Sequence, residues 1–147
     1  MASLEFMMPT LAKFPAPYNW AMTNSVVKGL TARFAGLVDS PTICKLGLKQ
    51  EMDARGVPVA SAATLSALSE EQRATTVVIV QDAFTSYFET QLVLDIADLL
   101  KRLGFNVQLA PFAPNGKPLH VHGFMKRFTK VAQQNVEMLR QFEAQGV

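Results

Sequence analysis

The sequence predicts an α/β fold in which helices flank a small parallel sheet, preceded by a helical and irregular N-terminal arm. Three observations support this prediction. Val77–Val80 is a short β-branched run, typical of a strand covered on both faces. An amphipathic helical pattern separates it from a second apolar run, Asn106–Ala110. A strand, a helix and a strand in this order form a parallel β–α–β unit by default.

The N-terminal part of the chain shows weaker patterns. Met1–Tyr18 is rich in methionine and proline, so we expect an irregular arm whose apolar side chains pack on the domain or on another surface. Its first residues are also compatible with a cloning remnant. A helix is expected around Ser25–Phe34, because apolar residues recur there at helical spacing. These residues are Val27, Leu30 and Phe34.

Gly36 follows the predicted helix as a stop signal, and prolines and glycines interrupt the stretch up to Thr75. We expect a loop-rich connector there, with short helical segments at Leu65–Leu68 and Ser69–Arg73. On this basis the chain divides into an arm and connector, residues 1–75, and an α/β domain, residues 76–147.

The helix after the first strand has two predicted ends. Ser86 and Glu89 have the spacing of a capping box, in which the serine oxygen accepts a backbone N–H three residues on. Gly104 can adopt the left-handed conformation that ends a helix, and Phe105 can then contact Leu100. Four aliphatic residues share the apolar face of this helix: Leu92, Ile96, Leu99 and Leu103.

The strongest helical pattern lies near the C-terminus and should cover one face of the sheet. It comprises Phe124, Phe128, Val131, Asn135, Leu139 and Phe142. With this helix, residues 76–145 have the layout of a Rossmann-like half.

Composition excludes several classes of protein. A hydrophobic content of 49% against 18% charged residues excludes wholesale disorder. The net charge is +2, and residues 1–75 and 76–147 each carry seven basic and six acidic groups, so nucleic acid is not an expected partner. The single cysteine, Cys44, cannot form an intramolecular disulfide and is expected to be a buried small hydrophobic residue. Neither a transmembrane run nor a secretion signal is evident, which predicts a cytoplasmic location.

The loop Pro111–Pro118 is the first candidate site, because it follows a strand and precedes a helix. Gly116 permits a sharp turn, Lys117 supplies positive charge, and the following helix N-terminus offers N–H groups to an anion. The glycine patterns of phosphate-binding loops are absent, and turn chemistry alone explains a Pro-Asn-Gly-Lys sequence. Binding of a nucleotide or other anion at Asn115–His122 therefore remains an alternative.

His120, His122 and Asp82 are the other candidate residues. On an extended segment the two histidines would project to the same side and could hold zinc, but no neighbouring thiol or carboxylate completes the ligand set. Two polar residues at the start of a helix are the simpler interpretation. Asp82, just after the first strand, could hold a metal or a ribose, and capping the next turn is its simpler role. No catalytic triad or carboxylate pair is identifiable.

Several features occur in a fixed order from the first strand to the last helix. Gln81–Phe84 follows the strand, Leu103–Val107 closes the helix, the proline-bearing loop ends in Gly116, and Gly123 and Asn135 follow. This order resembles the first half of the cysteine-rich domain that accompanies iron–sulfur modules in FAD-linked oxidoreductases. That group includes D-lactate-type and other D-2-hydroxy-acid dehydrogenases.

The resemblance also implies a loss. The family places one cysteine after the first strand and a Cys-Cys-Gly triplet at the loop, whereas this sequence has Ala83, Pro114 and Asn115 there and retains only Gly116. Because thiolates ligate clusters, the resemblance implies that this part binds neither a cluster nor a metal. It implies FAD and [4Fe–4S] clusters in a longer parent protein, held by upstream iron–sulfur and flavin domains. Residues 1–75 would then be the tail of the iron–sulfur segment.

Three hypotheses for function follow. The first is a non-catalytic accessory part of an FAD- and iron–sulfur-dependent oxidoreductase acting on a D-2-hydroxy acid, cytoplasmic or peripheral to a membrane through the parent enzyme. The second is a stand-alone α/β module that binds a nucleotide or another anion at residues 115–122. The third is an interaction domain that forms a homodimer through its apolar arm.

Overall fold

The computed structural model describes residues 4–35 and 41–147. A parallel sheet of β1 (Thr76–Ile79) and β2 (Asn106–Leu109) lies at the centre of the protein. The bridge of Val59 to Leu109 continues the pairing on the other edge of β2. Both predicted strands and their parallel pairing are confirmed. So is the α/β class, although most of the described residues are helical.

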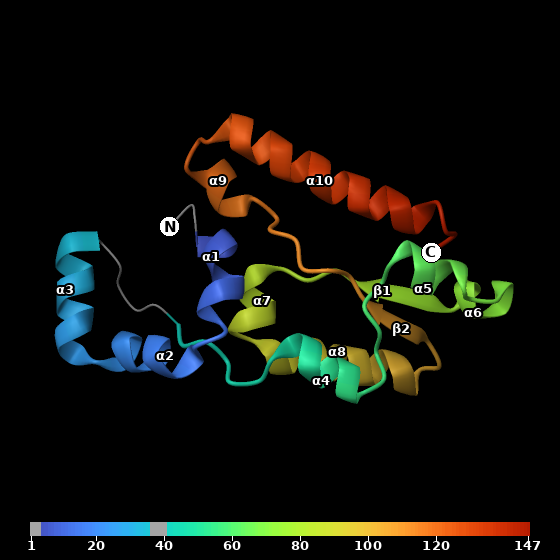
Figure 1. Cartoon of the computed structure of the whole chain (residues 1–147), viewed down its shortest axis with the longest axis horizontal. Helices are drawn as coiled ribbons and strands as arrows, with labels where there is room; N and C mark the ends of the chain where they lie inside the picture. Colours follow the sequence, from blue (N-terminus) through green and yellow to red (C-terminus); the bar gives the residue numbers. More distant parts are fainter. Residues whose placement is uncertain (1–3, 36–40) are drawn as a thin grey trace.

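Helical layers cover both faces of the sheet (Figure 1). On one face lie α4 (Leu48–Ala54) and α8 (Thr90–Arg102), and on the other lie α5 (Ala62–Ser66) and α10 (Met125–Glu143). The side chains of β1 alternate between these layers, since Ile79 packs on the α4–α8 side and Val78 packs on the α10 side. The core between the sheet, α4 and α8 consists of Leu48, Met52, Val57, Val93, Leu94, Ala97, Val107 and Leu109.

The N-terminal arm is helical, so the prediction of an irregular arm is wrong. It forms α1 (Leu4–Leu11), α2 (Pro15–Thr23) and α3 (Ser25–Ala35). Proline is compatible with the first turn of α2, because the N–H it lacks would have no partner there. Met8 of α1 is fully buried in a cluster with Ala83, so α1 packs on the rest of the protein.

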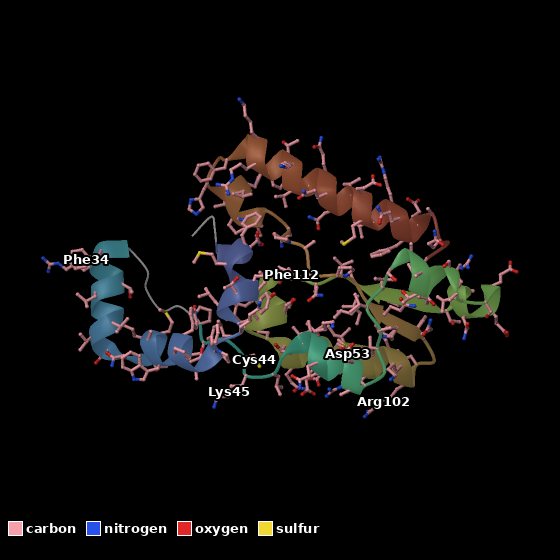
Figure 2. The ribbon with its side chains drawn as sticks, in the orientation of Figure 1. Phe34, Cys44, Lys45, Asp53, Arg102 and Phe112 are labelled. Carbon is pink, nitrogen blue, oxygen red and sulfur yellow. The ribbon has the colours of Figure 1, made fainter. Side chains whose placement is uncertain are left out.

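The predicted helix at Ser25–Phe34 is confirmed as α3, whereas its stop signal, Gly36, lies outside the described residues. α3 stands apart from the sheet and its covering helices in Figure 1, and Phe34 projects from its far end in Figure 2. The Phe34 side chain is 79% exposed. The spacing therefore identified a helix without identifying a buried face.

The connector contains more structure than the sequence predicts. Both short helical segments are present: α6 (Glu70–Ala74) is shifted by one residue from the prediction, and α5 begins three residues before Leu65. Each begins with a capping box. α4 was not predicted; its residues Leu48 and Met52, one turn apart, are buried against α8. Residues before and after Thr76 contribute to the same hydrophobic cores. The domain boundary between residues 75 and 76 stays a prediction.

The start of α8 differs from the prediction. Ser86 belongs to the short helix α7 (Ala83–Tyr87), so the capping box of Ser86 and Glu89 is wrong. The other end is as predicted. Gly104 has φ of 89°, and the N–H of Phe105 donates to the Leu100 carbonyl at 3.1 Å, which closes the last turn.

α8 also turns a different side to the core than its leucine spacing indicates. The four residues of the predicted apolar face are exposed by 42 to 65%: Leu92, Ile96, Leu99 and Leu103. The buried side consists of Thr90, Val93, Leu94 and Ala97. Apart from Leu94, the buried side chains are small or β-branched, which allows close packing against α4 and the sheet.

α10 is confirmed as the last helix, and Val131 and Phe142 of its predicted face are buried. Phe124 and Leu139 of the same face are 48% and 44% exposed, so this face of α10 is only partly covered. Within residues 4–35 and 41–147, no helix combines the length and hydropathy needed to cross a membrane.

Candidate functional site

The carboxyl ends of β1 and β2 meet at Gln81. Its side-chain Nε2 donates to the Ala110 carbonyl at 2.7 Å, and its Oε1 accepts a hydrogen bond from Ser86 Oγ at 2.8 Å. Ser86 is 3% exposed, so the hydroxyl and the amide satisfy each other away from water. This bridge holds the two strand ends and α7 together.

A groove of about 930 Å³ opens beside this bridge, where ligands collect in open parallel sheets. Gln81, Ser86 and Tyr87 contribute to its lining from the sheet side. Cys44, Asp53 and Phe112, which also line it, come from three other segments (Figure 2). Burial raises the pKa of the Tyr87 phenol, which keeps it a neutral hydrogen-bonding group.

Cys44 is half-buried in this groove, whereas the sequence predicts full burial. Its backbone N–H donates to the Tyr87 carbonyl at 2.7 Å, which fixes its segment beside α7. The segment therefore contributes Cys44 to the groove wall.

The predicted anion-binding loop receives a carboxylate from its own chain. Glu5 of α1 is only 7% exposed, and its Oε2 accepts a hydrogen bond from the Gly116 N–H at 3.1 Å. Burial raises the pKa of this carboxyl, and the N–H of Gly116 opposes the rise; the Asp82 charge raises the pKa further. The inward-facing donor of the loop is therefore already occupied.

Glu5 predicts a specific pH dependence of stability. Its pKa lies above 4.5 in the folded protein, so the folded state binds more protons than the unfolded chain between 4.5 and the folded pKa. Stability should therefore fall as pH rises through that interval. Glu5→Gln keeps an oxygen that can accept the Gly116 N–H, and should remove this fall. Urea unfolding between about pH 4 and 8 measures it.

The matched control is Glu5→Ala, which leaves the Gly116 N–H without an acceptor and should cost about 1–3 kcal/mol. A Glu5→Gln variant whose stability falls with pH as steeply as that of the wild type would contradict the assignment.

Asp82 and Asn115 act as local caps. Asp82 Oδ1 accepts the Thr85 N–H at 2.8 Å at the start of α7, the simpler role that the sequence indicates. Asn115 Oδ1 accepts the Lys117 N–H at 2.8 Å in a tight turn. Asn135 of α10 fixes the same loop, since its Nδ2 donates to the Pro114 carbonyl at 2.8 Å.

The two histidines project in different directions. They lie on α9 (Lys117–Val121) and at its C-cap, where residues two apart point to opposite sides, so the extended geometry considered for zinc is wrong. His120 and His122 are both exposed, and the His120 ring lies 4.9 Å from the Phe128 ring. No group of three or more His, Cys, Asp or Glu side chains suited to a metal ion occurs within residues 4–35 and 41–147.

The positions where the resemblance implies cysteines also have packing roles. Ala83 is buried in the cluster around Met8 and Ile43, and the Pro114 carbonyl is held by Asn135. None of these side chains, nor Asn115, can supply a thiolate. The residues present do not fit an iron–sulfur cluster.

The structure thus gathers three of the six candidate residues, Asp82, Asn115 and Gly116, around Glu5. Lys117, His120 and His122 lie on the exposed surface. Sequence reasoning missed Glu5, which is distant in the chain, and the groove at Gln81 and Ser86. The position of Gln81 directly after a strand was the available signal for the groove.

Curated relatives match the chain over its whole length. The D-2-hydroxyglutarate dehydrogenase of Pseudomonas putida is 43% identical over 147 residues, and those of Escherichia coli and Haemophilus influenzae are 35% and 33% identical over 147 residues. The chain covers 15% of the length of the first and 14% of the other two. No family model and no solved structure matches. The chain is homologous to a part of these dehydrogenases, and the cysteine-rich domain type stays a prediction.

Proposed function

We propose that this chain forms a non-catalytic α/β accessory segment of an FAD- and iron–sulfur-dependent oxidoreductase that acts on a D-2-hydroxy acid. The observation that carries the proposal is the similarity of all 147 residues to D-2-hydroxyglutarate dehydrogenases from three bacteria. These residues correspond to 14–15% of each relative, which leaves most of such an enzyme for the redox groups.

The local chemistry favours a structural role over a catalytic one. Side chains pack against α7, and the loop is held by hydrogen bonds from its backbone to Glu5 and Asn135. The flavin and the clusters of the enzyme would be held outside these residues. The partners of this segment would be the flavin and iron–sulfur domains of the same polypeptide. The alternative of anion binding at residues 115–122 stays a prediction.

A segment exchange tests the proposal. The Pseudomonas putida enzyme would carry this 147-residue sequence in place of its matched segment, which is 43% identical. The chimeric enzyme should oxidise D-2-hydroxyglutarate within about tenfold of the parent rate, because a supporting segment keeps its packing surfaces. Reduction of an artificial dye measures the rate, and flavin absorbance reports assembly.

The isolated chain is the control and should show no dye reduction. A chimera that retains its flavin yet oxidises the substrate no faster than buffer would contradict the proposal.

A further inference from the structure

The outer edge of β1 has unpaired backbone groups. The Asn106 N–H donates to the Thr75 carbonyl, and the Ala110 N–H donates to the Ile79 carbonyl. In a parallel ladder, alternate residues of a strand bond to the same neighbour, so Thr76 and Val78 direct their N–H and C=O groups away from β2. The N–H of Val80 also points outward, because the carbonyl of the same peptide, that of Ile79, faces β2. Val78 and Val80 have no hydrogen bond on that side among the described residues. β1 is therefore an open edge.

A groove of about 600 Å³ borders this edge. One wall is β1 itself, with Val77, Val78 and Val80, and the other is α10, with Val136 and Leu139. Val80 is 56% exposed and Val136 is 46% exposed. The groove therefore offers apolar contacts beside a row of unpaired backbone groups.

The exposed leucine face of α8 is directed to the same side of the sheet as the open edge of β1. Asp98 and Lys101, on the opposite side of the helix, contact Arg55 at the end of α4. α4 leads to Val59, which bridges the far edge of β2. The open edge of β1 and the exposed face of α8, with Ile96 and Leu99, thus both lie on the side of the sheet away from α4 and Val59.

We infer that the open edge of β1 binds an extended apolar segment from the part of the oxidoreductase polypeptide outside these 147 residues. This inference rests on the proposed function, because the relatives provide the occupant: about 85% of the Pseudomonas putida chain lies outside the match. The segment pairs its backbone with Val78 and Val80 and places alternate apolar side chains against α10.

An uncovered edge of this kind is unusual for physical reasons. Parallel sheets occur almost only where helices and further strands bury them, and two strands alone bury little. Exposed apolar edge strands also pair with one another and aggregate, and Val77–Val80 carries none of the charges or prolines that prevent this. Covering by another segment removes both problems.

Hydrogen exchange and a pair of variants test the inference. The amides of Val78 and Val80 should exchange slowly in the full-length chimeric enzyme and rapidly in the isolated chain. Val80→Pro removes only an outward N–H, and Val80→Ala is the matched control that keeps it. In the chimera, Val80→Pro should speed exchange at Val78 about tenfold relative to Val80→Ala. In the isolated chain the Val78 amide should exchange at the same rate in the two variants.

Three other outcomes separate the inference from the proposed function. If the chimera is active but the amides of Val78 and Val80 exchange as fast as in the isolated chain, no segment pairs with β1; the inference fails while the proposed function stands. If the chimera binds flavin and protects both amides but is inactive, the proposed function fails while the pairing at the edge of β1 stands. Protection that rises with concentration in the isolated chain identifies a second copy as the occupant.

Discussion

Leu94→Ala is expected to destabilise the isolated chain by about 2–5 kcal/mol, the range for removing a fully buried leucine side chain. Leu94 is 0% exposed and contacts the core shared by α4, α8 and the sheet. The loss combines the transfer of apolar atoms to water with the cavity left behind. Urea unfolding measures this loss of stability as a lower midpoint concentration with an unchanged m value.

Leu99→Ala is the matched control, because it makes the same chemical change on the opposite side of the same helix. Leu99 is 56% exposed, so its truncation should change stability by less than about 0.5 kcal/mol. Equal effects of the two substitutions would mean that α8 turns its leucine face to the core after all.

Gly116→Ala is expected to be the second strongly destabilising change, by about 2–5 kcal/mol. Gly116 has φ of 76°, where a side chain costs about 1–2 kcal/mol. A Cβ there would also lie 3.2 Å from side-chain atoms of Phe128 and Val131, and such crowding typically costs about 1–3 kcal/mol. The close approach of the loop to α10 is the structural reason for glycine at this position.

Gly123→Ala provides the control for Gly116→Ala. Gly123 has the same φ of 76°, and an added Cβ there meets no atom within 4 Å. Both substitutions reduce the entropy of the unfolded chain equally, so the difference in unfolding free energy isolates the contact with α10. Variants of equal stability would show that α10 does not pack on the loop.

The sequence predicted those features that depend on neighbouring residues. The β-branched run of β1 and the glycine that ends α8 are decided within a few residues of chain, and both are confirmed. The parallel pairing followed from the strand–helix–strand order alone.

The features that sequence reasoning missed depend on distant contacts. α8 has apolar residues on two sides, and the position of α4, rather than the helical period, decides which side is buried. The sequence leaves His120 and His122 open between an extended segment and the start of a helix, because the single turn of α9 has no distinctive pattern. The candidate site was incomplete for the same reason, since nothing local connects Glu5 to Gly116.

The hydrogen bond between Glu5 and Gly116 joins residues 111 positions apart. Closing so long a stretch of chain is entropically costly, and such contacts form after the local ones. α1 is therefore held by contacts that local structure alone cannot form, and its release would expose Met8 and Ala83 while leaving β1 paired with β2.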